Sequence, residues 1–304
     1  MSNVMVIPPV LSALVKSEDV LGAGRVWSAV NALQSRFLGD FFVRRSELSC
    51  FSEKELRAWA SMTAYDLNEI LAREGFSIRL SDFNRGEFGV VSILDVMVEW
   101  LVMGRHLSLP VEKQMYPAVH MMPTGLIEDM PVRLFDATMS SVHPHPLVRL
   151  NTRSGDSVCM TIADHVYDDF GLMSRIDDIR CRSEITPILA SWLLFPMVDL
   201  DLETILDWLV GMHTVAANGE NANIIQAVQQ TKFKMNHLGA RVKSAVGMGV
   251  TRTSVRVDVA EPILIDEPFF LWIERPCLSF PLMYAYIDEQ HWKDPGDIMR
   301  RECA

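Results

Sequence analysis

The chain has 304 residues, 49% of them hydrophobic, and a formal net charge of -11 at pH 7. This length and composition allow a large buried core, and the acidic balance excludes general nucleic-acid binding, because a protein that neutralises phosphates needs a basic face. The five cysteines lack metal-ligand spacing, so we expect mostly buried free thiols at Cys50, Cys159, Cys181, Cys277 and Cys303.

The first quarter of the chain predicts two amphipathic helices, over residues 26–42 and 53–74. In the second helix, apolar side chains such as Leu67 and Leu71 fall near one stripe. Ser52 followed by Glu55 offers a capping box at the start of that helix.

The N-terminus lacks the basic start of a secretory signal, and no apolar run is long enough for a membrane span. The sequence also contains no Asn-x-Ser/Thr glycosylation acceptor. We therefore expect a protein that is cytoplasmic, or secreted without a recognisable signal peptide, and that has no membrane partner.

The middle of the chain predicts strands. Residues 90–100 are strand-like although Asp95 and Glu99 interrupt them. Residues 110–166 contain short apolar runs broken by proline, glycine and histidine, as in a sheet-rich region. Residues 201–209 are predicted to form a helix, because acidic side chains near its start suit the positive end of a helix dipole.

Candidate catalytic groups are few. The sequence Ser154-Gly155-Asp156-Ser157 resembles a fragment around the nucleophile of some serine proteases, but the glycines that would follow it there are missing. We interpret it as a hairpin turn. The eight histidines are scattered, whereas a metal site needs three or four converging ligands. We therefore predict that the chain is not an enzyme and that it holds no metal or cofactor.

The segment from residue 233 to residue 288 is the most informative part of the chain. Residues 233–236 alternate in polarity as in a half-buried strand, and Gly239 then supplies a permissive backbone point. Residues 247–254 predict an exposed loop, and residues 268–273 and 281–287 predict two strands buried on both faces. Between glycine and loop, small side chains alternate with the long charged Arg241 and Lys243, as in a strand with one face ready for a tight core: Ala240, Val242, Ser244 and Val246.

This order resembles the carboxyl-terminal region of the serpins, the serine-protease-inhibitor superfamily, in which a hinge, an exposed reactive loop and two closing core strands follow one another. Asp266–Ile273 resembles the strand after the loop, and Pro281–Ile287 resembles the last strand. Asn3–Leu14 resembles the strand and helix that open the core, and Val90–Trp100 resembles the strand that ends in a tryptophan under the insertion point. His120–Met122 and Phe195–Pro196 resemble two other landmarks. The helix across the main sheet is matched by five spaced residues: Leu56, Trp59, Thr63, Leu67 and Leu71.

The resemblance implies an α+β serpin fold, with a large central β-sheet, two smaller sheets and a reduced set of helices. It also implies a single domain over residues 1–304 with an exposed reactive-centre loop at about residues 240–258. The chain is shorter than a usual family member and has fewer helices between Pro9 and Trp59, so it resembles a minimal serpin, similar to compact intracellular viral members.

The resemblance further implies the site residues. The hinge comprises Gly239, Ala240, Val242, Ser244 and Val246. The sheet-opening region includes Trp100, Ser92 and Gln229, of which Ser92 and Gln229 stand in place of the usual asparagine and histidine. Counting from Gly239 places the cut bond at Arg252-Thr253, which suits trypsin-like proteases. Counting back from Pro268 places it near Arg256, and Asp258 is a third option, for proteases that cut after aspartate.

Two functions follow as hypotheses. In the first, the chain is a suicide-substrate inhibitor of a serine protease: the protease cuts the loop, is acylated, and the loop inserts into the sheet as an extra strand. In the second, the chain is a non-inhibitory serpin-fold protein that binds a partner. The replaced polar residues near the opening region and Arg241 in the hinge favour the second. In both we expect a monomer.

Overall fold

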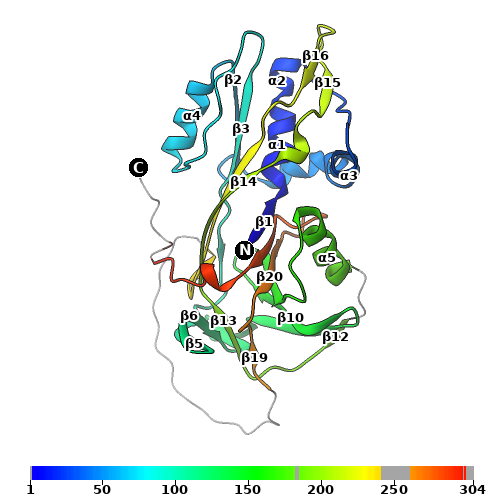
Figure 1. Ribbon diagram of the computed structural model, residues 1–304. Helices are drawn as coiled ribbons and strands as arrows, with labels where there is room; N and C mark the ends of the chain where they lie inside the picture. The colour runs from blue at the N-terminus through cyan, green and yellow to red at the C-terminus, as the bar shows by residue number, and fades with distance from the viewer. Residues whose placement is uncertain (1, 182–184, 241–260, 297, 299–304) are drawn as a thin grey trace.

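The computed structural model describes residues 2–181, 185–240, 261–296 and 298 of the chain (Figure 1). Its helices within these residues are α1 (Ile7–Lys16), α2 (Glu18–Leu21), α3 (Ala32–Asp40), α4 (Ala64–Arg73) and α5 (Asp169–Cys181), with 3-10 helices η1 (Phe42–Cys50), η2 (Asp207–Leu209) and η3 (Glu289–His291).

The largest sheet has seven strands, and each neighbouring pair in it is antiparallel. In spatial order they are β1 (Asn3–Val6), β21 (Met283–Ile287), β20 (Phe269–Glu274), β11 (Ser157–Ile162), β10 (His143–Asn151), β9 (Phe135–Ser140) and β12 (Ile185–Pro187).

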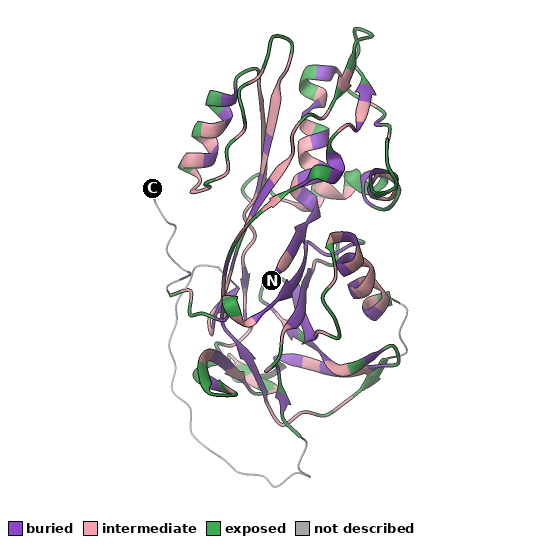
Figure 2. Ribbon diagram, viewed as in Figure 1, coloured by how far each residue is buried: buried purple, intermediate pink, exposed green. Residues whose placement is uncertain are grey.

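Both faces of this sheet are buried in its middle. On β20, Leu271 belongs to one apolar core and Trp272 belongs to a second core, which also contains side chains of α1, α3 and α5. Figure 2 shows these central strands as continuously buried segments. The prediction of two closing strands buried on both faces is confirmed, and so is the α+β fold with one large sheet.

Smaller sheets complete the fold. A four-stranded sheet has the order β19 (Ile263–Leu264), β13 (Leu193–Pro196), β6 (Gln114–Met121) and β5 (Arg105–Val111). Two hairpins are β7 (Thr124–Ile127) with β8 (Met130–Arg133), and β15 (His213–Val215) with β16 (Asn221–Asn223).

Three further strand pairs concern the segment around Gly239. They are β2 (Leu56–Ser61) with β3 (Gly89–Leu94), β14 (Val198–Ile205) with β17 (Val228–Met235), and β4 (Val98–Glu99) with β18 (Gly239–Ala240). The strand that leads to Gly239 therefore lies outside the seven-stranded sheet, so Gly239 and Ala240 do not adjoin the largest sheet, into which the resemblance implied insertion. In Figure 1, α4 lies beside β2 and β3, and β14 runs along the other side of this half of the molecule.

The predicted helix over residues 53–74 is wrong in its first half. Residues 56–61 form β2, and the helix begins only after Thr63, whose hydroxyl accepts a hydrogen bond from the Asp66 amide. The Ser52–Glu55 pair does form, with the Ser52 amide 2.9 Å from Glu55 Oε2, but it closes a turn instead of opening a helix. The helix predicted over residues 26–42 is also shorter, because Asn31 caps it and α3 starts at Ala32.

The predicted helix over residues 201–209 is wrong as well. Most of this segment belongs to β14, which pairs with β17 so that Asp201 lies opposite Lys232, with their charged atoms 3.1 Å apart. Asp199, Asp201 and Glu203 alternate with Leu200 and Leu202, which is a strand period. Cross-strand charge pairing therefore explains the acidic residues better than a helix dipole does.

The turn predicted at Ser154–Ser157 is confirmed, since it joins β10 to β11 and Gly155 has a φ of +84°. Asp156 is only 3% exposed and is held by Arg275, with two nitrogen–oxygen distances of 3.0 Å. Arg275 also donates to Glu55 at 2.7 Å. Asp156 is therefore a structural ion-pair partner that ties this turn to the end of β20.

Replacing Arg275 with alanine should lower the melting temperature of the protein by roughly 10 °C, because removing one partner of a buried pair costs roughly 3–5 kcal/mol. Thermal unfolding followed by circular dichroism measures this shift. The control is Arg133→Ala, since Arg133 and Asp136 form an exposed pair that should contribute about 0–1 kcal/mol. Equal shifts for the two variants would show that the Arg275 network is not stabilising.

A buried histidine gives the fold a pH dependence. Burial lowers the pKa of His143, and its Nε2 lies 2.9 Å from the Ile162 carbonyl, while Arg175 contacts its Nδ1 at 3.1 Å. Asp164 and His145 are the other titratable groups that face it.

The folded state favours the neutral His143 ring, so the folded-state pKa of His143 lies below its unfolded-state pKa of about 6.5. The contribution of His143 to folding stability is therefore complete above about pH 6.5 and is lost as the pH falls through the folded-state pKa. We expect the melting temperature to drop as the pH falls below about 6.5. His143→Asn should shrink this drop, and an unchanged drop in that variant would assign it to other groups.

Candidate functional site

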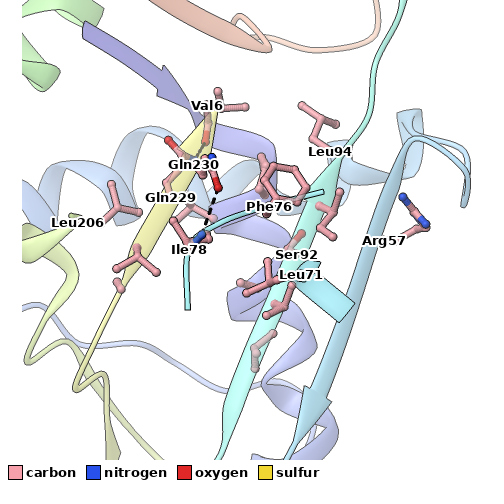
Figure 3. A pocket seen from close by; sticks show the side chains of 18 of the residues that line it. Val6, Arg57, Leu71, Phe76, Ile78, Ser92, Leu94, Leu206, Gln229 and Gln230 are labelled. Atoms are coloured by element: carbon pink, nitrogen blue, oxygen red, sulfur yellow. Dashed lines mark hydrogen bonds between the residues drawn. The ribbon is translucent and has the colours of Figure 1, made fainter. Parts of the chain in front are cut away.

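A cavity of about 940 Å³ separates β3 from β17 (Figure 3). Residues of β3 line one side, residues of β17 line the other, and α1 contributes Val10 and Leu14. Within the described residues, β3 and β17 belong to different two-stranded pairs and do not pair with each other. The gap therefore exposes the inner edges of two strands to the same empty space.

The chain after β17 reverses direction at one end of this gap. The Asn236 amide donates to the Gly239 carbonyl at 2.9 Å, and Gly239 and Ala240 pair with Glu99 and Val98. A Cβ added to Gly239 would lie 2.5 Å from the Val98 carbonyl oxygen, so only glycine fits this close approach. The first two residues of the predicted hinge thus already lie as a short strand between the end of β17 and β4.

Trp100 is hydrogen-bonded to this turn. It is 2% exposed, and its indole nitrogen donates to the Asn236 carbonyl at 3.0 Å. Its ring packs edge-on against Phe195, with the ring centroids 6.3 Å apart. The structure therefore places Trp100 directly against the chain reversal, where it fixes the backbone that leads into the hinge.

A pair of stacked histidines lies at the same turn. The rings of His106 and His237 have centroids 5.9 Å apart and are nearly parallel. Burial first, and then the neighbouring His106 ring, lower the pKa of His237, while Asp294 opposes them. The His237 carbonyl accepts a hydrogen bond from the Gly104 amide at 2.8 Å. The turn is thus held by backbone contacts next to a ring that favours its neutral form.

Two polar side chains in the cavity lack part of their hydrogen bonding. Gln229 donates its Nε2 to the Val6 carbonyl at 2.9 Å. Its Oε1 and the hydroxyl of Ser92 are buried, and neither has a hydrogen-bond partner among the described residues. They come from β17 and β3, the two strands that face each other across the cavity (Figure 3). A buried polar atom without a partner is costly, so a strand that entered here with its own donors would relieve that cost.

A segment of the chain also bridges the two sides of the cavity. Residues 76–81, which we call the strap, join α4 to the approach of β3. The amides of Ser77 and Ile78 donate to Gln230 Oε1 at 2.8 and 3.2 Å. On its other side, the strap is tied to α4 by Asn68, which exchanges two hydrogen bonds with Leu80. The hydrogen bonds between the strap and Gln230 must therefore break before another strand can lie between β3 and β17 in that part of the gap.

Replacing Gln230 with alanine should release the strap. We expect amide hydrogen exchange at Ser77 and Ile78 to become about tenfold faster or more, since each lost hydrogen bond contributes about 1 kcal/mol. Exchange mass spectrometry over residues 74–83 measures this. Gln290→Ala, at an exposed position, is the control. Unchanged exchange in Gln230→Ala would mean that the strap is held by its other contacts, such as the Asn68–Leu80 and Ser77–Glu203 hydrogen bonds.

The remaining predicted site residues lie outside the described residues, which end at Ala240 and resume at Glu261. These residues are Val242, Ser244 and Val246 of the hinge, Arg252 and Thr253 of the preferred bond, and the alternatives Arg256 and Asp258. The structure places Ser92 and Gln229 in the lining of the cavity, and it brings Gly239, Ala240 and Trp100 together at the chain reversal after β17. The sequence prediction missed the strap and Gln230, because their contact joins segments about 150 residues apart.

Two other properties bear on what this region binds. In the part of the chain that the structure describes, no group of three or more histidine, cysteine, aspartate and glutamate side chains is placed to hold a metal ion. No helix within the same residues is both long and apolar enough to cross a membrane. The cavity is lined by apolar side chains together with amide, hydroxyl and charged side chains, and the edges of β3 and β17 that flank it suit a segment of polypeptide.

Comparison with known proteins finds similarity in the fold. No protein-family model matches the chain, and a search of the curated proteins finds no match. Among solved structures, serpin48 of the insect Tenebrio molitor is 12% identical, with a TM-score of 0.59 over 94% of this chain and 91% of its own.

Two further solved structures are similar over most of their length. Uncleaved ovalbumin is 13% identical, with a TM-score of 0.56 over 94% of this chain and 92% of its own. The mouse protein-Z dependent protease inhibitor is 10% identical, with a TM-score of 0.52 over 94% and 90%. At these identities the comparison establishes the fold alone, over most of each chain.

Proposed function

We propose that this chain, whose fold is that of the serpin superfamily, inhibits a serine protease by offering the loop at about residues 240–258 as a substrate and, after cleavage, inserting the part of the loop upstream of the cut bond. One observation carries the proposal: Gly239 and Ala240 follow β17 and pair with β4, the strand after β3, while β3 and β17 themselves lie in separate strand pairs on either side of an unfilled cavity. A solved neighbour with the same fold, from mouse, is a protease inhibitor.

The proposed mechanism uses strand insertion as its source of free energy. The protease serine attacks a peptide bond of the loop and forms an acyl-enzyme, which releases the downstream part of the chain. The upstream part then continues from Ala240 between β3 and β17. The new strand pairs with both neighbours and buries its small side chains, so the acylated protease is carried along before water deacylates it. The uncleaved fold is thus a kinetically held state of higher free energy.

We propose Arg252-Thr253 as the bond that is cut, because an arginine suits the acidic pocket of trypsin-like proteases. The bond after Arg256 and the bond after Asp258 are the alternatives. The chain supplies no catalytic group to the reaction, and we propose that it acts as a monomer whose partner is the protease.

Incubation with trypsin followed by a denaturing gel tests the function. We expect a band at the summed mass of trypsin and the chain without its released C-terminal peptide, and we expect Arg252→Ala to abolish it. Trypsin blocked at its active-site serine is the control and should give no such band. If the complex still forms with Arg252→Ala but not with Arg256→Ala, the cut bond is the one after Arg256 and the proposed function stands.

A second function has its own support. The strap already occupies part of the gap through Gln230, and Ile7 and Val10 make the region near Gln229 apolar. These features would hinder opening and favour a non-inhibitory protein that binds a partner. Clean cleavage by trypsin without a covalent band would support this second function and would contradict the first.

A further inference from the structure

Two cysteine side chains meet on the surface, away from the cavity entrance. Cys50 ends η1, and Cys277 lies in the turn after β20 that the Leu278 amide closes onto the Arg275 carbonyl at 2.9 Å. The Cys50 thiol donates to the Cys277 carbonyl oxygen at 3.1 Å, and the two side chains also contact each other. Both are free cysteines, and neither is buried.

The two segments that carry these thiols are fixed to each other on both sides of the pair. On one side, the Ser279 amide donates to Glu47 Oε2 at 2.8 Å. On the other side, Arg275 donates to Glu55 Oε1 at 2.7 Å. Chain segments 227 residues apart are therefore held in register around Cys50 and Cys277 before any covalent bond exists. A disulfide needs this kind of prior approach of two backbones.

We infer that Cys50 and Cys277 form a redox site, which a small-molecule disulfide such as oxidised glutathione converts to an intramolecular disulfide. In the first step the Cys277 thiolate attacks one sulfur of the small disulfide, forms a mixed disulfide and releases one glutathione thiolate. In the second step Cys50 loses its proton to water and attacks the Cys277 sulfur, which releases the second glutathione. Two protein thiols are oxidised, and one small disulfide is reduced to two thiols.

The surroundings set the order of these steps. Burial, together with the contact to Cys277, raises the pKa of the Cys50 thiol to about 11. Cys50 is thus held as a thiol at neutral pH, whereas Cys277 is the more exposed of the two. Since the thiolate is the attacking species, Cys277 is the residue that meets the oxidant first, and Cys50 resolves the mixed disulfide.

The disulfide would tie the segment that leads into β2 to the turn between β20 and β21. Glu53 and Lys54 of that segment line the cavity, as do Ile273 and Leu282 on either side of the turn. Closing so long a loop restricts the unfolded chain strongly, so the oxidised protein should melt at a higher temperature. A second consequence rests on the proposed function: the tie would restrain β2 and β3 as the gap widens, and oxidised protein should give less covalent complex with trypsin.

The test uses the full-length uncleaved chain with Cys303→Ser, since Cys303 lies outside the described residues. We would treat it with oxidised glutathione, block remaining thiols by alkylation, and map peptides by mass spectrometry. The expected product joins the peptides of Cys50 and Cys277 and melts roughly 5–10 °C higher than the reduced protein. Cys181→Ser, which removes an exposed thiol on α5, is the control and should keep the link.

Cys50→Ser should leave a glutathione adduct on Cys277 and abolish both the link and the rise in melting temperature. Two results would overturn the redox site. One is a protein with both thiols that carries glutathione adducts but no Cys50–Cys277 link, and the other is a link that involves Cys181. Neither the link nor the melting temperature requires a protease. A chain that forms the disulfide but never traps trypsin therefore rejects the proposed function and leaves the redox site intact.

Discussion

Cutting the chain once between residues 241 and 260 should raise its melting temperature by roughly 20 °C or more. Under the proposed function, the cut lets the segment after Ala240 continue as a strand between β3 and β17, where it would fill a cavity of about 940 Å³. Each buried apolar side chain contributes roughly 1.5–3 kcal/mol, and 1 kcal/mol shifts the midpoint by roughly 2–4 °C in a chain of about this size. Four or five inserted side chains therefore suffice for the expected rise.

Differential scanning calorimetry of the uncut and the cut protein measures this rise, and N-terminal sequencing of the released fragment identifies the bond. The two fragments stay associated in a native preparation, so the comparison concerns the same set of residues. The intact chain with the Gln230→Ala change is a useful reference, because it frees the strap without supplying a new strand. A cut protein that melts at the same temperature as the uncut one would mean that no strand inserts.

Replacing Ala240 with glutamate should abolish trapping of the protease. Ala240 is 4% exposed and pairs with Val98, at the point where the inserting strand starts. A carboxylate at this already buried position would lack a partner, which costs several kcal/mol, so residue 240 would leave its pairing with Val98. Insertion then has no paired strand from which to extend, and the acyl-enzyme is hydrolysed first. We expect at least a hundredfold loss in the yield of covalent complex, while the loop is still cut.

The matched control is Ala23→Glu, which makes the same change at an exposed position. It should trap the protease as well as the unmodified chain does. Densitometry of the complex and cleaved bands against protease concentration gives the partition between the two outcomes. Full trapping by Ala240→Glu would place the start of insertion elsewhere in the chain.

Much of the fold could be predicted from local patterns. The strand predicted at residues 233–236 lies mostly within the longer β17 (Val228–Met235), and the turn at Gly155 and the two strands that close the chain each have a short-range signal that the structure confirms. The predicted helices over residues 53–74 and 201–209 failed for a different reason. Leu67 and Leu71 lie on α4, but the residues before Thr63 that continue the same apolar pattern form β2. In the second segment, Asp199, Asp201 and Glu203 alternate with leucines, which is the period of a strand and not of a helix.

The site was only partly accessible to sequence reasoning. Gly239 and Trp100 have recognisable surroundings, and the structure brings them together at the chain reversal. The strap, its contact with Gln230 and the meeting of Cys50 with Cys277 depend on segments that are far apart in the chain. No periodicity or local motif encodes such contacts, because they follow from the packing of the whole fold.

A crystal structure of the chain cut once within residues 241–260 tests the central claim most directly. We predict a strand that starts at Gly239, runs between β3 and β17, and pairs with both, so that the two strand pairs become one sheet and the cavity disappears. Gln229 Oε1 or the Ser92 hydroxyl should then contact the new strand. A cut protein in which β3 and β17 stay apart around the same cavity would contradict the claim.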